Sequence, residues 1–243
     1  MNTAEKLTVI AENQEKVYDK GRQDEWSDFW DSYQDYGRRV NYGEAFGRYA
    51  TNSINLWNDV SYKPKHDMYP TVLDRSYSHS RITDLKSIHE NLGIRFDTSK
   101  CYIFHFCFSG ALIKQLPEIS CIATADVYYT FASMPNLHTI DKVIVNDKGD
   151  TKFTGAFNDS HYLKNILFEG VIGQDISFAS CPLTCESMKS VISCLKNYSS
   201  ENTGVHTITF KDQCKTALEA EGTTSPNGNL WTEYVSDLGW VLA

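Results

Sequence analysis

The chain has 243 residues, of which 41% are hydrophobic and 22% are charged, a composition typical of a globular protein that buries a core. Its formal net charge of −8 argues against nucleic acid as the partner, and the sequence contains no basic run and no glycine-rich phosphate loop. The longest stretch without Asp, Glu, Lys or Arg, residues 127–140, is too short and too polar to span a membrane.

The amino-terminal residues contain no apolar segment of the kind found in secretory signals. We therefore expect cytoplasmic synthesis without a signal peptide, and export inside a particle such as a virion stays open. The seven cysteines are irregularly spaced and form no CxxC pair. This pattern favours small buried hydrophobic side chains over a disulfide framework or a metal site.

Residues 1–21 are predicted to form a helix that Gly21 ends. Its apolar side chains Leu7, Ile10 and Val17, together with Gln14, are spaced as a short heptad seam. A single helix of this length is marginal in water, so the seam needs a partner. Two alternatives remain open: a homo-oligomer formed through residues 1–20, or docking on the body of the same chain.

Residues 22–81 are predicted to form an aromatic-rich, partly irregular amino-terminal region. The spacing of Trp26, Phe29, Trp30 and Tyr33 is helical and one-sided, which indicates an amphipathic helix. This helix either packs its aromatic side on the body or forms an assembly surface. The candidate interface residues of the two amino-terminal segments are Leu7, Ile10, Val17, Trp26, Trp30 and Tyr33.

Residues 82–181 contain one pattern at a nearly constant period. Phe131 is followed by Leu137 and Ile140, and the same spacing recurs 26 residues later. A fixed period of this length is typical of stacked repeats, which bury equivalent residues in continuous columns. The predicted repeat core comprises Leu85, Ile88, Phe108, Ile113, Leu116, Phe131, Leu137, Ile140, Phe157, Leu163 and Ile166. Short strands are expected after each unit, at residues 93–97, 142–145 and 167–172.

The unit that begins at Ala156-Phe157 and ends at Leu163-Lys164-Asn165-Ile166 resembles the BspA-type leucine-rich repeat, AFxxCxxLxxI, with Ser160 at the cysteine position. The unit at Phe131 is similar, with Met134 at that position. The resemblance covers roughly residues 82–210 and implies an α+β fold: a short leucine-rich-repeat β-solenoid with an amino-terminal helix and a carboxy-terminal α/β cap. It also implies surface recognition or adhesion. The order of segments is similar to that of small repeat proteins carried by phages and prophages of Firmicutes.

Residues 182–243 no longer follow the repeat and are expected to form the α/β cap. Thr184 is a candidate N-cap for a helix that extends to about residue 196. A strand at 205–210, helices at 211–221 and 230–238, and a last strand at 240–242 complete this region.

Motifs for catalysis are largely missing. Ser193 and Lys196 match the Ser-x-x-Lys spacing of a nucleophile and its base, but one short match is expected by chance. Cys181 and Cys185 are separated by Pro182, so they are not expected on one helix face, and no histidine completes a metal site. We therefore expect no catalytic residue, no metal and no cofactor.

The repeat pattern favours a non-enzymatic recognition module that binds a protein or a glycan through its repeat face, and the resemblances imply adhesion and an origin in a phage or prophage. The first alternative is a structural scaffold or virion assembly protein acting through the amino-terminal helix and aromatic segment. The second is an enzyme with Ser193 and Lys196 in a cleft.

Overall fold

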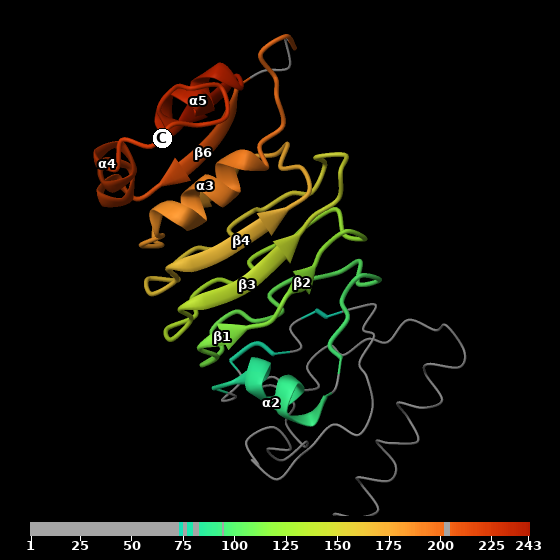
Figure 1. Cartoon of the computed structure of the whole chain (residues 1–243). Coiled ribbons are helices and arrows are strands. Elements are labelled where there is room, and N and C mark those ends of the chain that lie inside the picture. Colours follow the sequence, from blue (N-terminus) through green and yellow to red (C-terminus); the bar gives the residue numbers. More distant parts are fainter. Residues whose placement is uncertain (1–72, 75–76, 80–82, 94, 202–204) are drawn as a thin grey trace, which may run out of the picture. The chain divides into compact units, whose positions relative to one another are not determined.

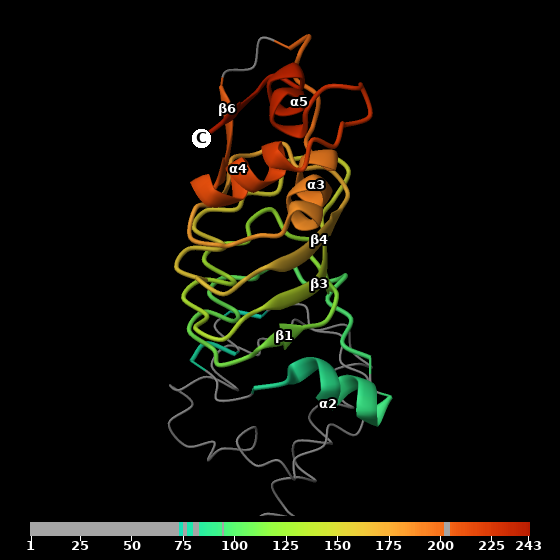
Figure 2. The ribbon, with the colours of Figure 1, turned by 60° about the vertical axis from the view of Figure 1, so that its left-hand side comes forward.

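The computed structural model describes residues 73–74, 77–79, 83–93, 95–201 and 205–243. All of these lie in one compact unit of the chain, Asn41–Ala243. Successive chain segments lie one above another in this unit, with the strands on one side and loops on the other (Figure 1, Figure 2).

The first sheet is parallel and is centred on its longest strand. It comprises β1 (Gln115–Leu116), β2 (Ile119–Ser120), β3 (Thr139–Ile144) and β4 (Asn165–Glu169), and it follows helix α2 (Leu85–Leu92). Both β1 and β2 pair with β3 on one side, and β4 pairs with it on the other. Pro117 lies between β1 and β2 and has no N–H to donate, which explains the interruption.

The second sheet is also parallel, with the order β5 (Ile176–Phe178), β6 (His206–Phe210) and β7 (Trp240–Leu242). Parallel neighbours require long crossover connections. Helix α3 (Cys185–Ser193) lies in the connection from β5 to β6. Helices α4 (Asp212–Ala220) and α5 (Trp231–Asp237) lie between β6 and β7.

A column of stacked rings runs through the core of both sheets. It consists of Tyr77, Phe108, Phe131, Phe157, Phe178 and Phe210, all of them buried. Successive ring centroids are 5.2, 5.8, 5.4, 4.5 and 5.9 Å apart, with interplanar angles of 27° or less. The step from Phe157 to Phe178 joins the first sheet to the second, so the core is continuous where the strand pairing is not.

Three six-residue turns, 105–110, 128–133 and 154–159, position the phenylalanines of this column. In the first two turns the N–H groups of the second, fourth and sixth residues donate to carbonyl groups of the next turn, at 2.7–3.0 Å. The second and sixth residues have positive φ angles, for example 50° at Phe106 and 48° at Tyr129. The fourth residue is Phe108, Phe131 or Phe157. The turns therefore stack in register, and their phenyl rings stack with them.

The first sheet ends at β4 because a helix occupies the position of the next strand. The N–H of Ile166 donates to Ser187 Oγ and that of Phe168 donates to Ser190 Oγ, each at 2.9 Å. Both serines belong to α3, so hydroxyl groups take the place of strand carbonyl groups along the edge of β4.

The predicted fold class, a leucine-rich-repeat β-solenoid, is wrong. The structure is a mixed α/β fold whose parallel strands form two separate small sheets, with helices between the strands of the second. The reason is local. The hydroxyl groups of residues 187 and 190 accept hydrogen bonds from the backbone N–H groups at the edge of β4, so the sheet does not continue into β5. The phenylalanines recur at a regular spacing because their rings stack, and rings can stack without one continuous sheet.

Strand positions also differ from the predictions. Residues 93–97 contain a single bridge residue, Phe96, in place of the expected strand. The strands expected at 142–145 and 167–172 begin earlier, at Thr139 and Asn165, because Ile140 and Ile166 lie within the strands themselves. The carboxy-terminal predictions are confirmed: α3, β6, α4, α5 and β7 occupy the expected positions, and Thr184 caps α3 by accepting from the N–H of Ser187.

Candidate functional site

The predicted repeat-core residues lie inside the protein and cannot contact a ligand. Of the described side chains in that set, all are at most 1% exposed: Leu85, Phe108, Ile113, Leu116, Phe131, Leu137, Ile140, Phe157, Leu163 and Ile166. The side chain of Ile88 is outside the described part of the chain, as are the candidate interface residues Leu7, Ile10, Val17, Trp26, Trp30 and Tyr33.

A row of exposed side chains lies where the strands of the first sheet begin. Lys114, His138 and Lys164 directly precede β1, β3 and β4, while Thr83 and Thr184, at the two ends of the row, precede helices α2 and α3. The N–H of Lys114 donates to Thr83 O, that of His138 to Lys114 O, that of Lys164 to His138 O, and that of Thr184 to Lys164 O, at 2.9–3.0 Å. All five side chains are exposed. We call the three middle residues, Lys114, His138 and Lys164, the basic row.

The neighbours of the basic row are neutral and polar. The next residue along each segment is Gln115, Thr139 or Asn165, and Asn165 Nδ2 lies 3.5 Å from Thr139 Oγ1. The ring of Tyr162 stacks on that of His138, with centroids 5.8 Å apart and planes inclined by 19°. Tyr162 is 54% exposed, so it adds an accessible aromatic ring to this surface.

The charges of the basic row differ from those on the adjoining strand face. There, Lys86 Nζ lies 2.7 Å from an Asp141 carboxylate oxygen, and Lys142 Nζ lies 2.7 Å from one of Glu169. The partner carboxylate raises the pKa of each of these two lysines. By contrast, Lys114 and Lys164 form no ion pair with any residue that the structure describes. Their positive charges are therefore available to an incoming anion.

A second group of aromatic side chains lies on the turns: His105, Phe106, Tyr128 and Tyr129, all half-exposed. Phe106 and Tyr129 stack at 5.4 Å with an angle of 17°. The other face of the Tyr129 ring lies against Gly155, where a Cβ would come within 2.6–2.8 Å of ring atoms. Both faces of that ring are thus covered within the protein. The Tyr129 ring therefore packs the stacked turns together and offers neither face to a ligand.

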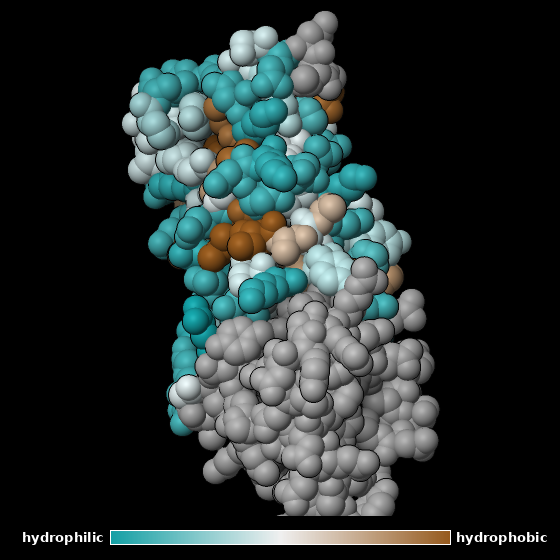
Figure 3. All heavy atoms as spheres, turned by 90° about the vertical axis from the view of Figure 1, so that its right-hand side faces the viewer, coloured by the Kyte–Doolittle hydropathy of each residue, from teal (hydrophilic) through white to brown (hydrophobic). Residues whose placement is uncertain are grey.

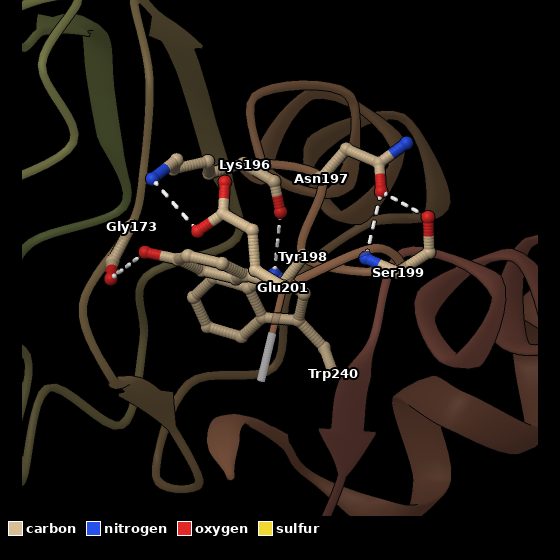
Figure 4. A network of polar contacts seen from close by, with 7 residues as sticks. All are labelled: Gly173, Lys196, Asn197, Tyr198, Ser199, Glu201 and Trp240. Carbon is tan, nitrogen blue, oxygen red and sulfur yellow. Dashed lines mark hydrogen bonds and ion pairs between the residues drawn. The ribbon is translucent and has the colours of Figure 1, made fainter. Parts of the chain in front are cut away.

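The best-ordered polar network surrounds Tyr198 in the carboxy-terminal part (Figure 4). Tyr198 Oη donates to Gly173 O at 2.8 Å, and Trp240 Nε1 donates to Lys196 O at 2.8 Å. The Tyr198 ring stacks on His206 at 4.1 Å, and Lys196 Nζ lies 4.6 Å from its centroid on a cation–π contact. Tyr198 and Trp240 are buried, so this network joins the connection after α3 to β6 and β7 and has a structural role.

Ser193 and Lys196 do not form a nucleophile–base pair. Ser193 Oγ donates to Lys189 O at 2.7 Å, while Lys196 Nζ lies 3.4 Å from Glu201 Oε2 (Figure 4). Within the described ranges, no group of three or more His, Cys, Asp or Glu side chains could hold a metal ion. No helix of the described residues is long and apolar enough to cross a membrane.

All seven cysteines are free thiols; five are buried, and Cys185 and Cys194 are half-buried. Burial raises the pKa of the Cys101 and Cys181 thiols to about 12. At neutral pH these thiols are protonated and unreactive, because the thiolate is the nucleophile. They act as small core side chains: Cys181 Sγ, for example, donates to Phe157 O at 3.5 Å.

The side of the molecule where the strands end offers a different surface (Figure 3). Hydrophobic residues gather near the middle of this view and again higher up, with hydrophilic ones between. The basic row, whose residues are connected by backbone hydrogen bonds, is the candidate for ligand contact.

No protein-family model, no curated protein sequence and no solved structure matches this chain. The candidate site therefore depends on the geometry of the residues alone. Sequence reasoning missed the basic row, although a signal was present. Lys114, His138 and Lys164 each directly follow a predicted core aliphatic residue, Ile113, Leu137 or Leu163.

Proposed function

We propose that this chain is a non-enzymatic recognition module that binds an extended ligand, a glycan in particular, through the surface where its strands begin. The observation that carries the proposal is the row of exposed side chains at equivalent positions of successive segments, connected by backbone hydrogen bonds. Such a surface is open and regular, and it suits a ligand that itself extends along the row. A catalytic site instead brings several groups together around one reacting atom.

The resemblance to BspA-type repeats and to small phage and prophage proteins supports adhesion, with the chain displayed on a virion, as the setting for this binding. The competing proposal is a scaffold that acts through Trp26, Trp30 and Tyr33. No described residue favours it, since those three lie outside the described part of the chain.

A binding screen with the full chain tests the proposal. The immobilised protein is exposed to a panel of polysaccharides, and bound material is recovered and compared with the input by mass spectrometry. We expect saturable binding to some members of the panel and recovery of the ligand with unchanged mass.

Two results would contradict it. Recovered ligand with altered mass would show an enzyme, and an absence of binding to every polysaccharide would remove glycan recognition. The variant Trp26→Ala/Trp30→Ala provides the comparison with the scaffold proposal. Loss of all partner binding in this variant, with binding retained after substitution of the basic row, would favour the scaffold.

A further inference from the structure

We infer that the basic row binds the oxyanion groups, carboxylate or sulfate, of an acidic polysaccharide. The inference rests on the proposed function and specifies its ligand. It is unexpected for a chain whose net charge is −8, because acidic proteins as a whole repel polyanions. The attraction must then come from a local concentration of positive charge.

The geometry brings this concentration about. Backbone hydrogen bonds join His138 to Lys114 and Lys164 to His138, at 2.9 and 3.0 Å, so the three residues lie on adjacent rungs of the stack. Neighbouring strands are about 4.8 Å apart, which places Lys114 and Lys164 about 10 Å from each other. The three residues directly precede the parallel strands β1, β3 and β4, so we expect the two ammonium groups on either side of His138.

Electrostatics keeps the row free for an anion. Thr83 and Thr184 are at its two ends, and both are uncharged. Asp159, five residues before Lys164, lies 3.9 Å from His161 Nε2. The acids of the strand face, Asp141 and Glu169, are already paired with Lys86 and Lys142. Asp84 and Glu186 flank the two ends of the row, and Lys114 and Lys164 form no ion pair with either of them or with another described residue.

The surroundings fit a sugar chain better than an acidic peptide. Gln115, Thr139 and Asn165 supply amide and hydroxyl groups that match sugar hydroxyls, and Tyr162 supplies an exposed ring on which an apolar sugar face can lie. An extended peptide gains affinity mainly by pairing with a free strand edge. The edge of β4 is closed by Ser187 and Ser190, so that mode is blocked beside the row.

The test compares four probes on the full chain by biolayer interferometry at 0.05 and 0.15 M NaCl: dextran sulfate, hyaluronan, neutral dextran and polyglutamate. The test variant is Lys114→Gln/Lys164→Gln. The matched control is Lys148→Gln/Lys152→Gln, which removes two other exposed lysines and changes the net charge equally. Lys114→Arg/Lys164→Arg keeps the charge at the row.

We expect the intact chain to bind dextran sulfate or hyaluronan more tightly than neutral dextran, and the difference to shrink at higher salt. The test variant should lose at least tenfold in affinity. The matched control and the arginine variant should stay within about twofold. Tyr162→Ala should cost a few-fold, since it removes the ring and leaves the charges.

Equal losses in the test and control variants would overturn the inference, because they indicate attraction to net charge alone. Polyglutamate binding as tight as that of the polysaccharides, with the same dependence on the row, would assign the site to an acidic peptide. Binding of neutral dextran that is unaffected by any variant would refute the inference while the proposed function stands. Failure to bind any glycan, here and in the wider panel, would refute both.

Discussion

Both sheets of this protein consist of short parallel strands, but they differ in their connections and in what lies at the edge of the last strand. The first connects short strands through stacked turns, and its last edge, β4, is closed by the hydroxyls of Ser187 and Ser190. The second connects its strands through helices, and its last strand, β7, has no described strand beyond it. The column of rings nevertheless passes from one to the other through Phe157 and Phe178. Side-chain stacking, more than strand pairing, holds the two regions together.

The largest expected effect on stability comes from removing the ring contact between Phe157 and Phe178. Phe157→Ala removes a buried ring that stacks on Phe131 at 5.4 Å and on Phe178 at 4.5 Å. We expect a loss of about 3–5 kcal/mol in the free energy of unfolding, as for other buried phenylalanines. Urea denaturation followed by circular dichroism measures it, with Tyr162→Ala, which truncates an exposed ring, as control.

The shape of the transition sharpens the comparison. If the column couples the two sheets, the intact chain unfolds the described region in one transition, and Phe157→Ala separates it into two. A single transition in the variant at almost unchanged urea concentration would show that the ring contributes little to the coupling of the two sheets.

A smaller effect is expected at the closed edge of β4. Ser187→Ala leaves the N–H of Ile166 buried without its acceptor and also removes the hydroxyl to which Thr184 Oγ1 donates. The expected loss is about 1–2 kcal/mol, the cost of an unsatisfied buried donor. Ser193→Ala is the matched control on the same helix, because the Ser193 hydroxyl is exposed and bonds only to Lys189 O. Thermal unfolding of both variants decides the matter, and equal stabilities would mean that the edge does not need the hydroxyl.

The smallest effect concerns the loop before α5 in the second region. Asn229 Nδ2 and Asn227 Nδ2 donate to Asp237 Oδ2 at 2.7 and 2.8 Å, and these hydrogen bonds lower the pKa of the Asp237 carboxyl. A lowered pKa stabilises the folded state above the unfolded value of about 3.9, and this contribution disappears as the pH falls through the folded value. Stability should therefore decline slightly more below about pH 4 in the intact chain than in Asp237→Asn. Parallel stability profiles from pH 6 to pH 3 in the two proteins would argue against this role.

Much of the local structure could be predicted from the sequence. The spacing of Phe131 and Phe157 predicted the buried column, and the N-cap residue Thr184 predicted the start of α3. The overall fold could not be predicted, because the same spacing is consistent with one continuous sheet or with stacked turns beside two sheets. The deciding contacts are hydrogen bonds from β4 to Ser187 and Ser190, and nothing in the sequence distinguishes these serines from solvent-exposed ones.

The candidate site shows a similar limit. Lys114, His138 and Lys164 are ordinary surface residues in the sequence, 24 and 26 positions apart. They become a group only when the segments stack in register. The turns were harder to predict, since the second residue of each, which has a positive φ angle, is Phe106, Tyr129 or Gly155, and only the last of these favours that conformation. A bulky residue in this conformation costs about 1–2 kcal/mol, which the stacked rings must offset.

The edge of β7 that does not pair with β6 has a practical consequence for handling this protein. Trp240–Leu242 carries no charge and no proline, and Val241 is 47% exposed. Natural sheets usually protect such an edge with lysine, proline or a covering element, because unprotected strands pair with one another when molecules are crowded. Since no described strand pairs with the outer edge of β7, we expect edge-to-edge association in concentrated solutions, and Val241→Lys should reduce it.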